Sequence, residues 1–268
     1  MFSCPVCGLV RRLKYGIEPV VPPQHRATMT NPKHISTTAP HDHESACAHV
    51  TSLFSGRWLR EYVRGKLRID PMYGVVYEHL RGSSLPILDL GCGIGILPYY
   101  LRQRGLQSRM IGVDWDAGRI ALAQQVAQTG YQNLSFVHQD ARTPIQFQGH
   151  VAILDLLHYI NDDDQRRLLD TVAESIAPGG VAIIRQCPRD SSNRFKLTNI
   201  VERLSCALRW HKGSTINFPT HETIVQPFRA RCFTEEIFPM WGGTPFNNYL
   251  FVFRHPKDSD SSGGTMKD

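Results

Sequence analysis

Apolar positions follow two patterns along the chain, and each pattern predicts a type of secondary-structure element. Short apolar runs end in turn or polar residues at "LPILDL", "SRMIGVD", "LSFVHQD", "HVAILDLLHYI" and "VAIIRQ". Between several of these runs lie segments whose apolar residues recur every three or four positions, which is the period of an amphipathic helix. Strands that alternate with helices in this way predict a mostly parallel sheet with helices on both faces.

Helical periodicity begins near Ser55 and continues to Asp70. A second short helix is expected from Pro71, because proline suits the first position of a helix. Four further helices are expected: one after Gly95, then over "DAGRIALAQQVAQTG", "NDDDQRRLLDTVAESIA" and "FKLTNIVERLSCALRW". The segments "TEEIFPMW" and "NYLFVFRH" predict a closing antiparallel hairpin. The expected fold is therefore α/β, with seven strands in one sheet.

The two ends of the chain show neither the strand pattern nor the helix pattern. Residues 1–50 are rich in proline, threonine, serine and histidine, so we expect an irregular N-terminal extension. The same argument predicts a disordered tail over residues 256–268. Residues 51–255 remain as one α/β domain, and 41% hydrophobic content in 268 residues is enough for a single core.

Net charge and cysteine content place only weak limits on the partners and the cellular compartment. A net charge of +6 is compatible with nucleic acid, anionic lipid or an acidic protein partner, and equally with a solvated basic face. Seven cysteines, an odd number in a long chain, favour a reducing cytoplasm over a disulfide framework. No apolar stretch approaches the ~20 residues that span a bilayer, and no secretory signal pattern is present.

The stretch "ILDLGCGIG", residues 87–95, leads a buried strand into alternate glycines. Glycine costs roughly 0.5–1 kcal/mol relative to alanine inside an element, so this spacing indicates a sharp turn with something close against it. The dinucleotide fingerprint G-x-G-x-x-G fails at Ile96, and no phosphate-binding P-loop is present. The pattern that fits is D-x-G-x-G-x-G, through Asp89, Gly91, Gly93 and Gly95. Here the sequence resembles the class I S-adenosylmethionine-dependent methyltransferases.

Acids at the ends of the later strands support this resemblance. Asp114 ends the second strand 23 residues after Gly91 (114 − 91), where Rossmann-like folds place an acid that binds ribose hydroxyls. The resemblance implies that Asp140 accepts from the adenine amino group and that Asp155 lies where methyl transfer occurs. Each acid alone is also typical of a turn. The resemblance implies a Rossmann-like sheet, S-adenosyl-L-methionine as cofactor, and cofactor contacts from Asp89, Gly91, Cys92, Gly93, Gly95, Asp114, Trp115, Asp140, Ala141 and Asp155.

His158 and Tyr159 are the candidate catalytic residues, because they follow the fourth strand. His158 is either a general base, which adds ~10²–10⁴-fold to a rate, or a structural residue bonded to backbone. Arg185 ends the fifth strand and either holds an acceptor carboxylate or forms a surface salt bridge.

The acceptor is less constrained. The segments "LRWHKGSTINFPTHETI" and "PMWGGTPFNNYLFVFRH" look like a bacterial subgroup associated with aryl-polyene and fatty-acid-like biosynthesis. This likeness implies a small or carrier-bound acyl, aryl or polyketide-like acceptor, and the basic helix Arg57–Arg68 would suit an acidic acyl carrier protein. The alternative for that helix is a solvated basic face.

Two other functions remain open. "CPVCG" at Cys4–Cys7 is half a zinc knuckle and is similar to the start of some ribosomal RNA methyltransferases, which would make nucleic acid the substrate. Structural zinc needs four ligands and the second cysteine pair is missing, so no metal site is expected. A cofactor-binding subunit without catalytic activity is the third alternative.

Overall fold

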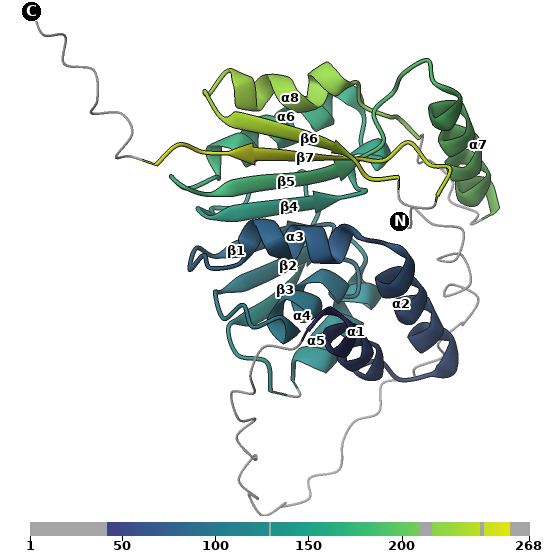
Figure 1. The fold of residues 1–268 in the computed structure, drawn as a ribbon, viewed down its shortest axis with the longest axis vertical. Coiled ribbons are helices and arrows are strands. Elements are labelled where there is room, and N and C mark those ends of the chain that lie inside the picture. Colours follow the sequence, from purple (N-terminus) through teal and green to yellow (C-terminus); the bar gives the residue numbers. More distant parts are fainter. Residues whose placement is uncertain (1–41, 129, 209–215, 242–243, 258–268) are drawn as a thin grey trace, which may run out of the picture.

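The computed structural model of the protein describes residues 42–128, 130–208, 216–241 and 244–257. Its centre is a seven-stranded sheet in the order β3-β2-β1-β4-β5-β7-β6 (Figure 1). The strands are β1 (Ile87–Leu90), β2 (Met110–Asp114), β3 (Leu134–His138), β4 (His150–Leu154), β5 (Val181–Gln186), β6 (Thr234–Pro239) and β7 (Tyr249–Arg254). Strands β1 to β5 pair in parallel, and β7 is antiparallel to both β5 and β6. The predicted α/β fold with a C-terminal antiparallel hairpin is confirmed.

Helices cover both faces of this sheet. They are α1 (His43–Ser52), α2 (Arg57–Ile69), α3 (Met72–Leu80), α4 (Ile96–Gln103), α5 (Ala117–Ala127), α6 (Asp162–Glu174), α7 (Asn193–Leu208) and α8 (His221–Arg229), with a short 3-10 helix over Leu157–Tyr159. Successive strand residues point to opposite faces. Ile87 accordingly packs with the cluster formed by α1 to α5, whereas Leu88 and Leu90 pack with α6 and α8.

Helix α1 is a correction to the sequence analysis. Asp42 caps it by accepting from the Ser45 amide at 2.8 Å, and Ala46 and Val50 are fully buried. The expectation of irregular structure up to residue 50 is therefore wrong for residues 43–50. Small and polar residues dominate this helix, so its few apolar positions gave no visible period. The remainder of the predicted extension and most of the predicted tail lie outside the described residues, and the domain boundaries stay predictions.

The carboxyl-terminal edge of the parallel strands is where the topology leaves room for a ligand. The chain passes from β1 outward to β2 and β3, then returns to β4 on the other side of β1. Ligands in such sheets bind beyond the strand ends at this reversal. Helices α2 and α7 both lie at this edge (Figure 1). Among the described residues, no helix is long and apolar enough to cross a bilayer.

Candidate functional site

In the glycine turn after β1, Gly93 and Gly95 are required for different reasons. Gly91, Gly93 and Gly95 have φ of 82°, 58° and 82°, in the left-handed region that disfavours side chains. A Cβ on Gly95 would lie 2.6 Å from Phe136 of β3, so that glycine is required by packing within the protein. A Cβ on Gly93 would meet nothing within 4 Å. The backbone at Gly93 therefore faces open space, where a ligand can approach it.

Asp114 joins the end of β2 to this turn. Its Oδ2 accepts from the Gly93 amide at 2.9 Å, and its Oδ1 accepts from the Asp116 amide at 2.9 Å. The Arg119 guanidinium lies 3.7 Å from the same carboxylate. Asp114 is 4% exposed, so these bonds are shielded from water and hold the turn in place. The carboxylate therefore positions the turn as well as being a candidate ligand for ribose.

A first cavity opens between this turn and α2. It is lined by Tyr62, Lys66, Met72, Tyr73, Asp89, Gly91, Cys92, Gly93, Ile94, Ile96, Leu97, Asp114, Trp115, Arg119, Leu154, Asp155 and Leu156. Burial, with the nearby charge of Asp114, raises the pKa of Asp89 to about 7. The described part of the chain gives Asp89 no ion pair, and a buried carboxylate is stabilised by a cation. An open glycine backbone and two buried acids fit a ligand that carries an ammonium group and hydroxyls.

A second cavity adjoins the first, and Tyr62, Lys66 and Asp155 line both. Its volume is about 150 Å³. Its lining also includes Gly65, Ile69, Asp70, Pro71, His158, Arg185, Cys187, Thr198, Glu202, Phe218, Met240, Trp241, Thr244, Phe246 and Asn248. Helices α2 and α7 and the turn after β6 thus enclose a largely apolar space beside the polar one.

A buried ion-pair network lines the second cavity and reaches the first through Asp155. The Arg185 Nη1 atom lies 2.5 Å from Asp70 Oδ2 and 3.2 Å from Asp155 Oδ2, and Arg185 is only 8% exposed. The pair with Asp70 is therefore not the surface salt bridge considered from the sequence. Asp155 has φ 58°, a conformation that costs a non-glycine residue of order 1–3 kcal/mol and is common at functional sites. The network fixes the turn after α2 against the ends of β4 and β5.

His158 lies in the second cavity, in the 3-10 helix after β4. It is 3% exposed, and burial lowers its pKa to about 4. Its Nδ1 lies 3.0 Å from Gln186 Nε2, and its ring stacks on Phe218 with centroids 5.2 Å apart. Tyr159 instead packs with Cys187, Ile216 and Phe218 and lines neither cavity. Of the two candidate catalytic residues, His158 therefore lines the second cavity, whereas Tyr159 lines neither cavity.

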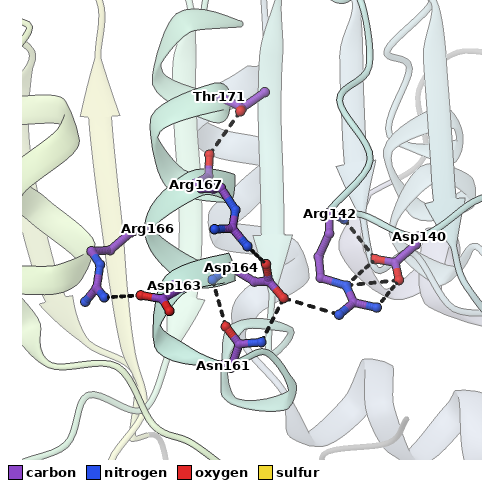
Figure 2. Close-up of polar contacts among 8 residues, drawn as sticks. All are labelled: Asp140, Arg142, Asn161, Asp163, Asp164, Arg166, Arg167 and Thr171. Atoms are coloured by element: carbon purple, nitrogen blue, oxygen red, sulfur yellow. Dashed lines mark hydrogen bonds and ion pairs between the residues drawn. The ribbon is translucent and has the colours of Figure 1, made fainter.

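Asp140 and Ala141 are not among the residues that line the first cavity. Figure 2 shows Asp140 bonded to Arg142, whose Nη2 lies 2.5 Å from Asp140 Oδ2 and whose Nη1 lies 3.3 Å from Asp164. This pairing lowers the pKa of Asp140. Ala141 lines a third cavity on the α6 face of the sheet, together with Leu88 and other apolar residues. The contacts of Asp140 and Ala141 with a cofactor stay predictions.

Several residues of the site were absent from the sequence analysis. Tyr62 and Lys66 lie four positions apart on α2, which puts both on one side of the helix. Asp70 and Gln186 act through partners far away in sequence, Arg185 and His158 respectively. No local pattern marks such residues, because their role depends on which strands become neighbours.

The sheet order, the glycine turn and the acids at the strand ends define the class I methyltransferase fold. The crystal structure of magnesium protoporphyrin IX methyltransferase from Synechocystis PCC 6803 with bound SAH matches with a TM-score of 0.56 and 16% identity. The match covers 79% of this chain and 93% of that one. Residues 87–180 match the family model described as a methyltransferase domain. Residues 87–180 therefore match a methyltransferase domain, and the described chain has the fold of the class I S-adenosylmethionine-dependent methyltransferases.

Curated relatives extend this finding at lower coverage. Demethylmenaquinone methyltransferase of Deinococcus radiodurans is 25% identical over 187 residues, which are 62% of this chain and 78% of that protein. Ubiquinone biosynthesis O-methyltransferase of Stutzerimonas stutzeri is 28% identical over 108 residues, 38% of this chain and 44% of that protein. The chain spans between 24% and 78% of the lengths of the curated relatives that it matches.

Proposed function

We propose that this protein transfers a methyl group from S-adenosylmethionine to a small organic acceptor held in the second cavity. The observation that carries the proposal is that the two cavities adjoin and share Tyr62, Lys66 and Asp155. One cavity has the open glycine backbone and the two buried acids that would suit the cofactor. The other is largely apolar and of small-molecule size. The relatives named for demethylmenaquinone and for ubiquinone biosynthesis also point to a small-molecule acceptor.

The cofactor would be held by the residues around the glycine turn. When bound, S-adenosylmethionine supplies a methyl group carried on a positively charged sulfur. Asp89 would pair with a cationic group in its buried position, while Asp114 would accept from hydroxyls with the lone pairs that its backbone bonds leave. Gly93 would let the backbone approach the ligand, since no atom of the described residues lies within 4 Å of a Cβ built there. Trp115, which is 44% exposed at the cavity, would cover a flat part of the ligand.

Catalysis in such a site depends mainly on placement. Holding two reactants in reactive geometry can supply about 7–11 kcal/mol of the barrier. The ion pairs of Arg185 with Asp70 and Asp155 hold Asp155, which lines both cavities, in a fixed position beside the place where the two ligands would meet. His158, in the 3-10 helix, lines the second cavity, where it would face the acceptor.

The test is methyl transfer from labelled S-adenosylmethionine to defined pools. Small aromatic and quinone-like molecules, acyl carrier protein loaded with acyl groups, and ribosomal RNA are offered separately to the full chain. Label in the small molecules supports the proposal. Label only on loaded carrier shows that the acceptor is carrier-bound, and label only in RNA shows that the nucleic-acid alternative holds. Cofactor binding without transfer to any pool indicates the subunit that lacks catalytic activity.

A further inference from the structure

The second cavity has a size and lining that select one shape of ligand. Its volume of about 150 Å³ equals that of an apolar engineered cavity that binds benzene. Phe218, Met240, Trp241 and Phe246 provide most of the apolar wall on the side of α7 and the hairpin, and Ile69 closes the α2 side. A single flat ring with a short substituent fits this space. The polar groups at its inner end then decide what the substituent must be.

The hydrogen bond of Gln186 fixes which nitrogen of His158 carries the proton. The Gln186 Nε2 atom lies 3.0 Å from His158 Nδ1 and 3.4 Å from the carbonyl oxygen of Cys187. Only an amide nitrogen donates to a carbonyl, so this second contact sets the orientation of the amide. The amide therefore donates to Nδ1, and Nδ1 accepts. A neutral imidazole that accepts at Nδ1 carries its proton at Nε2.

The Nε2 hydrogen of His158 is then a buried donor that lacks an acceptor within the described part of the chain. Trp241 Nε1 and Arg185 Nε, on two other residues that line the same cavity, are buried and unpaired in the same sense. All three are N–H donors, and none can accept. Buried donors are rarely left without partners in native proteins. The group that completes them must bring hydrogen-bond acceptor lone pairs, which an oxygen atom supplies.

We propose that the second cavity takes a single-ring, planar acceptor with a hydrogen-bond-accepting oxygen, and that His158 donates its Nε2 hydrogen to that oxygen. This inference rests on the proposed function only in calling the ligand a methyl acceptor. Binding of the ligand in the second cavity does not depend on methyl transfer. His158 is then a specificity residue that selects an oxygen, and Gln186 is its positioning residue. Because Nε2 already holds a proton, His158 does not serve as the general base considered from the sequence.

Two probes of equal shape separate the hydrogen bond from the apolar fit. Acetophenone carries a carbonyl oxygen where α-methylstyrene carries a methylene group, and neither molecule donates. Binding of each is measured by calorimetry to the full chain, with and without S-adenosylmethionine. We expect acetophenone to bind at least about tenfold more tightly, which corresponds to about 1.4 kcal/mol. His158→Phe keeps a ring against Phe218 but removes the donor, so this preference should disappear.

The control is His150→Gln, which changes the buried histidine at the start of β4, a residue that does not line the cavity, and should keep the preference. A direct readout comes from nitrogen-15 NMR of labelled histidine, in which His158 should show its proton on Nε2. A proton on Nδ1, equal binding of the two probes, or no binding of either would each overturn the inference. Probe binding that depends on His158 in a protein without affinity for S-adenosylmethionine would leave the inference standing and contradict the proposed function.

Discussion

The two edges of the parallel sheet contain the same residue types in opposite circumstances. At the amino-terminal edge, a Cβ on Gly149 would lie 2.3 Å from the Pro86 carbonyl oxygen, and His150 uses both ring nitrogens, one toward Ser83 and one toward the Val181 amide. At the carboxyl-terminal edge, Gly93 faces open space and His158 leaves one nitrogen without a partner in the described chain.

Burial does not distinguish these edges. The two histidines are 2% and 3% exposed, and burial lowers the pKa of each to about 4. What differs is whether the protein itself satisfies the groups. The amino-terminal edge is complete without a ligand, so its glycine and histidine contribute to stability. The carboxyl-terminal edge is incomplete, so its glycine and histidine are available for binding.

The largest effect should come from replacing the two glycines. Gly149→Val forces a side chain into a backbone carbonyl, and we expect loss of folding or at least about 4 kcal/mol of unfolding free energy. Gly93→Val costs only the left-handed backbone strain, about 1–3 kcal/mol, but fills the space where the cofactor lies. Denaturant melts and calorimetry with S-adenosylmethionine should show a folded Gly93 variant without binding. Normal cofactor affinity in that variant would refute the assignment of the turn.

The next effect is the pH dependence of stability from the two histidines. Each has a folded pKa near 4 against about 6.5 when unfolded, so between these values the unfolded state binds more protons. Their stabilisation is therefore complete above pH 6.5 and is lost as pH falls to 4, by about 3 kcal/mol per histidine. His150→Gln and His158→Gln should each flatten the slope of unfolding free energy against pH in denaturant melts. An unchanged slope in either variant would show that its histidine titrates normally.

Asp89 opposes this trend from the carboxyl-terminal edge. Its folded pKa of about 7 lies above the unfolded value of 3.8, so its contribution is complete at low pH and is lost as pH rises from 3.8 to 7. Asp89→Asn should therefore steepen the rise of stability with pH and stabilise the protein at pH 7. The same melts check this prediction, and an unchanged slope in Asp89→Asn would contradict the raised pKa. S-adenosylmethionine, a cation, should bind the wild type more tightly as pH rises through 7.

The sequence was sufficient for the fold and for much of the first cavity, because both depend on local patterns. Strand ends, the glycine turn and the acids at Asp89 and Asp114 follow one another along the chain at recognisable spacings. Asp140 follows the same pattern, yet Arg142, two residues away, pairs with it outside the cavity (Figure 2). The tautomer of His158 depends on Gln186 of a neighbouring strand, and the wall of the second cavity on Asp70 and Arg185. Such contacts arise from tertiary packing, which no local spacing encodes.

A smaller effect is expected for Asp114, the second of the three acids at Asp89, Asp114 and Asp140. Asp114→Ala removes an acceptor for ligand hydroxyls and releases the Gly93 amide, so cofactor affinity should fall tenfold or more, since a hydrogen bond to a charged group contributes about 1.5–3 kcal/mol. Calorimetry of the folded variant checks this. Asp114→Asn keeps acceptor oxygen without charge and should recover part of the affinity. Wild-type affinity in Asp114→Ala would mean that the ribose lies elsewhere.

The smallest effect should come from Asp140, the third acid of that pattern. Its pair with Arg142 is about half-exposed, and exposed ion pairs are worth about 0–1 kcal/mol, so Asp140→Ala should change unfolding free energy by less than that. Because Arg142 already occupies its carboxylate, any bond to adenine must first break that pair, and cofactor affinity should fall less than tenfold. Arg142→Ala is the matched test: it leaves the carboxylate to the adenine and should bind the cofactor at least as well as wild type. A tenfold loss of cofactor affinity in Asp140→Ala, with no gain in Arg142→Ala, would contradict this prediction. It would show that Asp140 contributes as much to cofactor binding as Asp114 does.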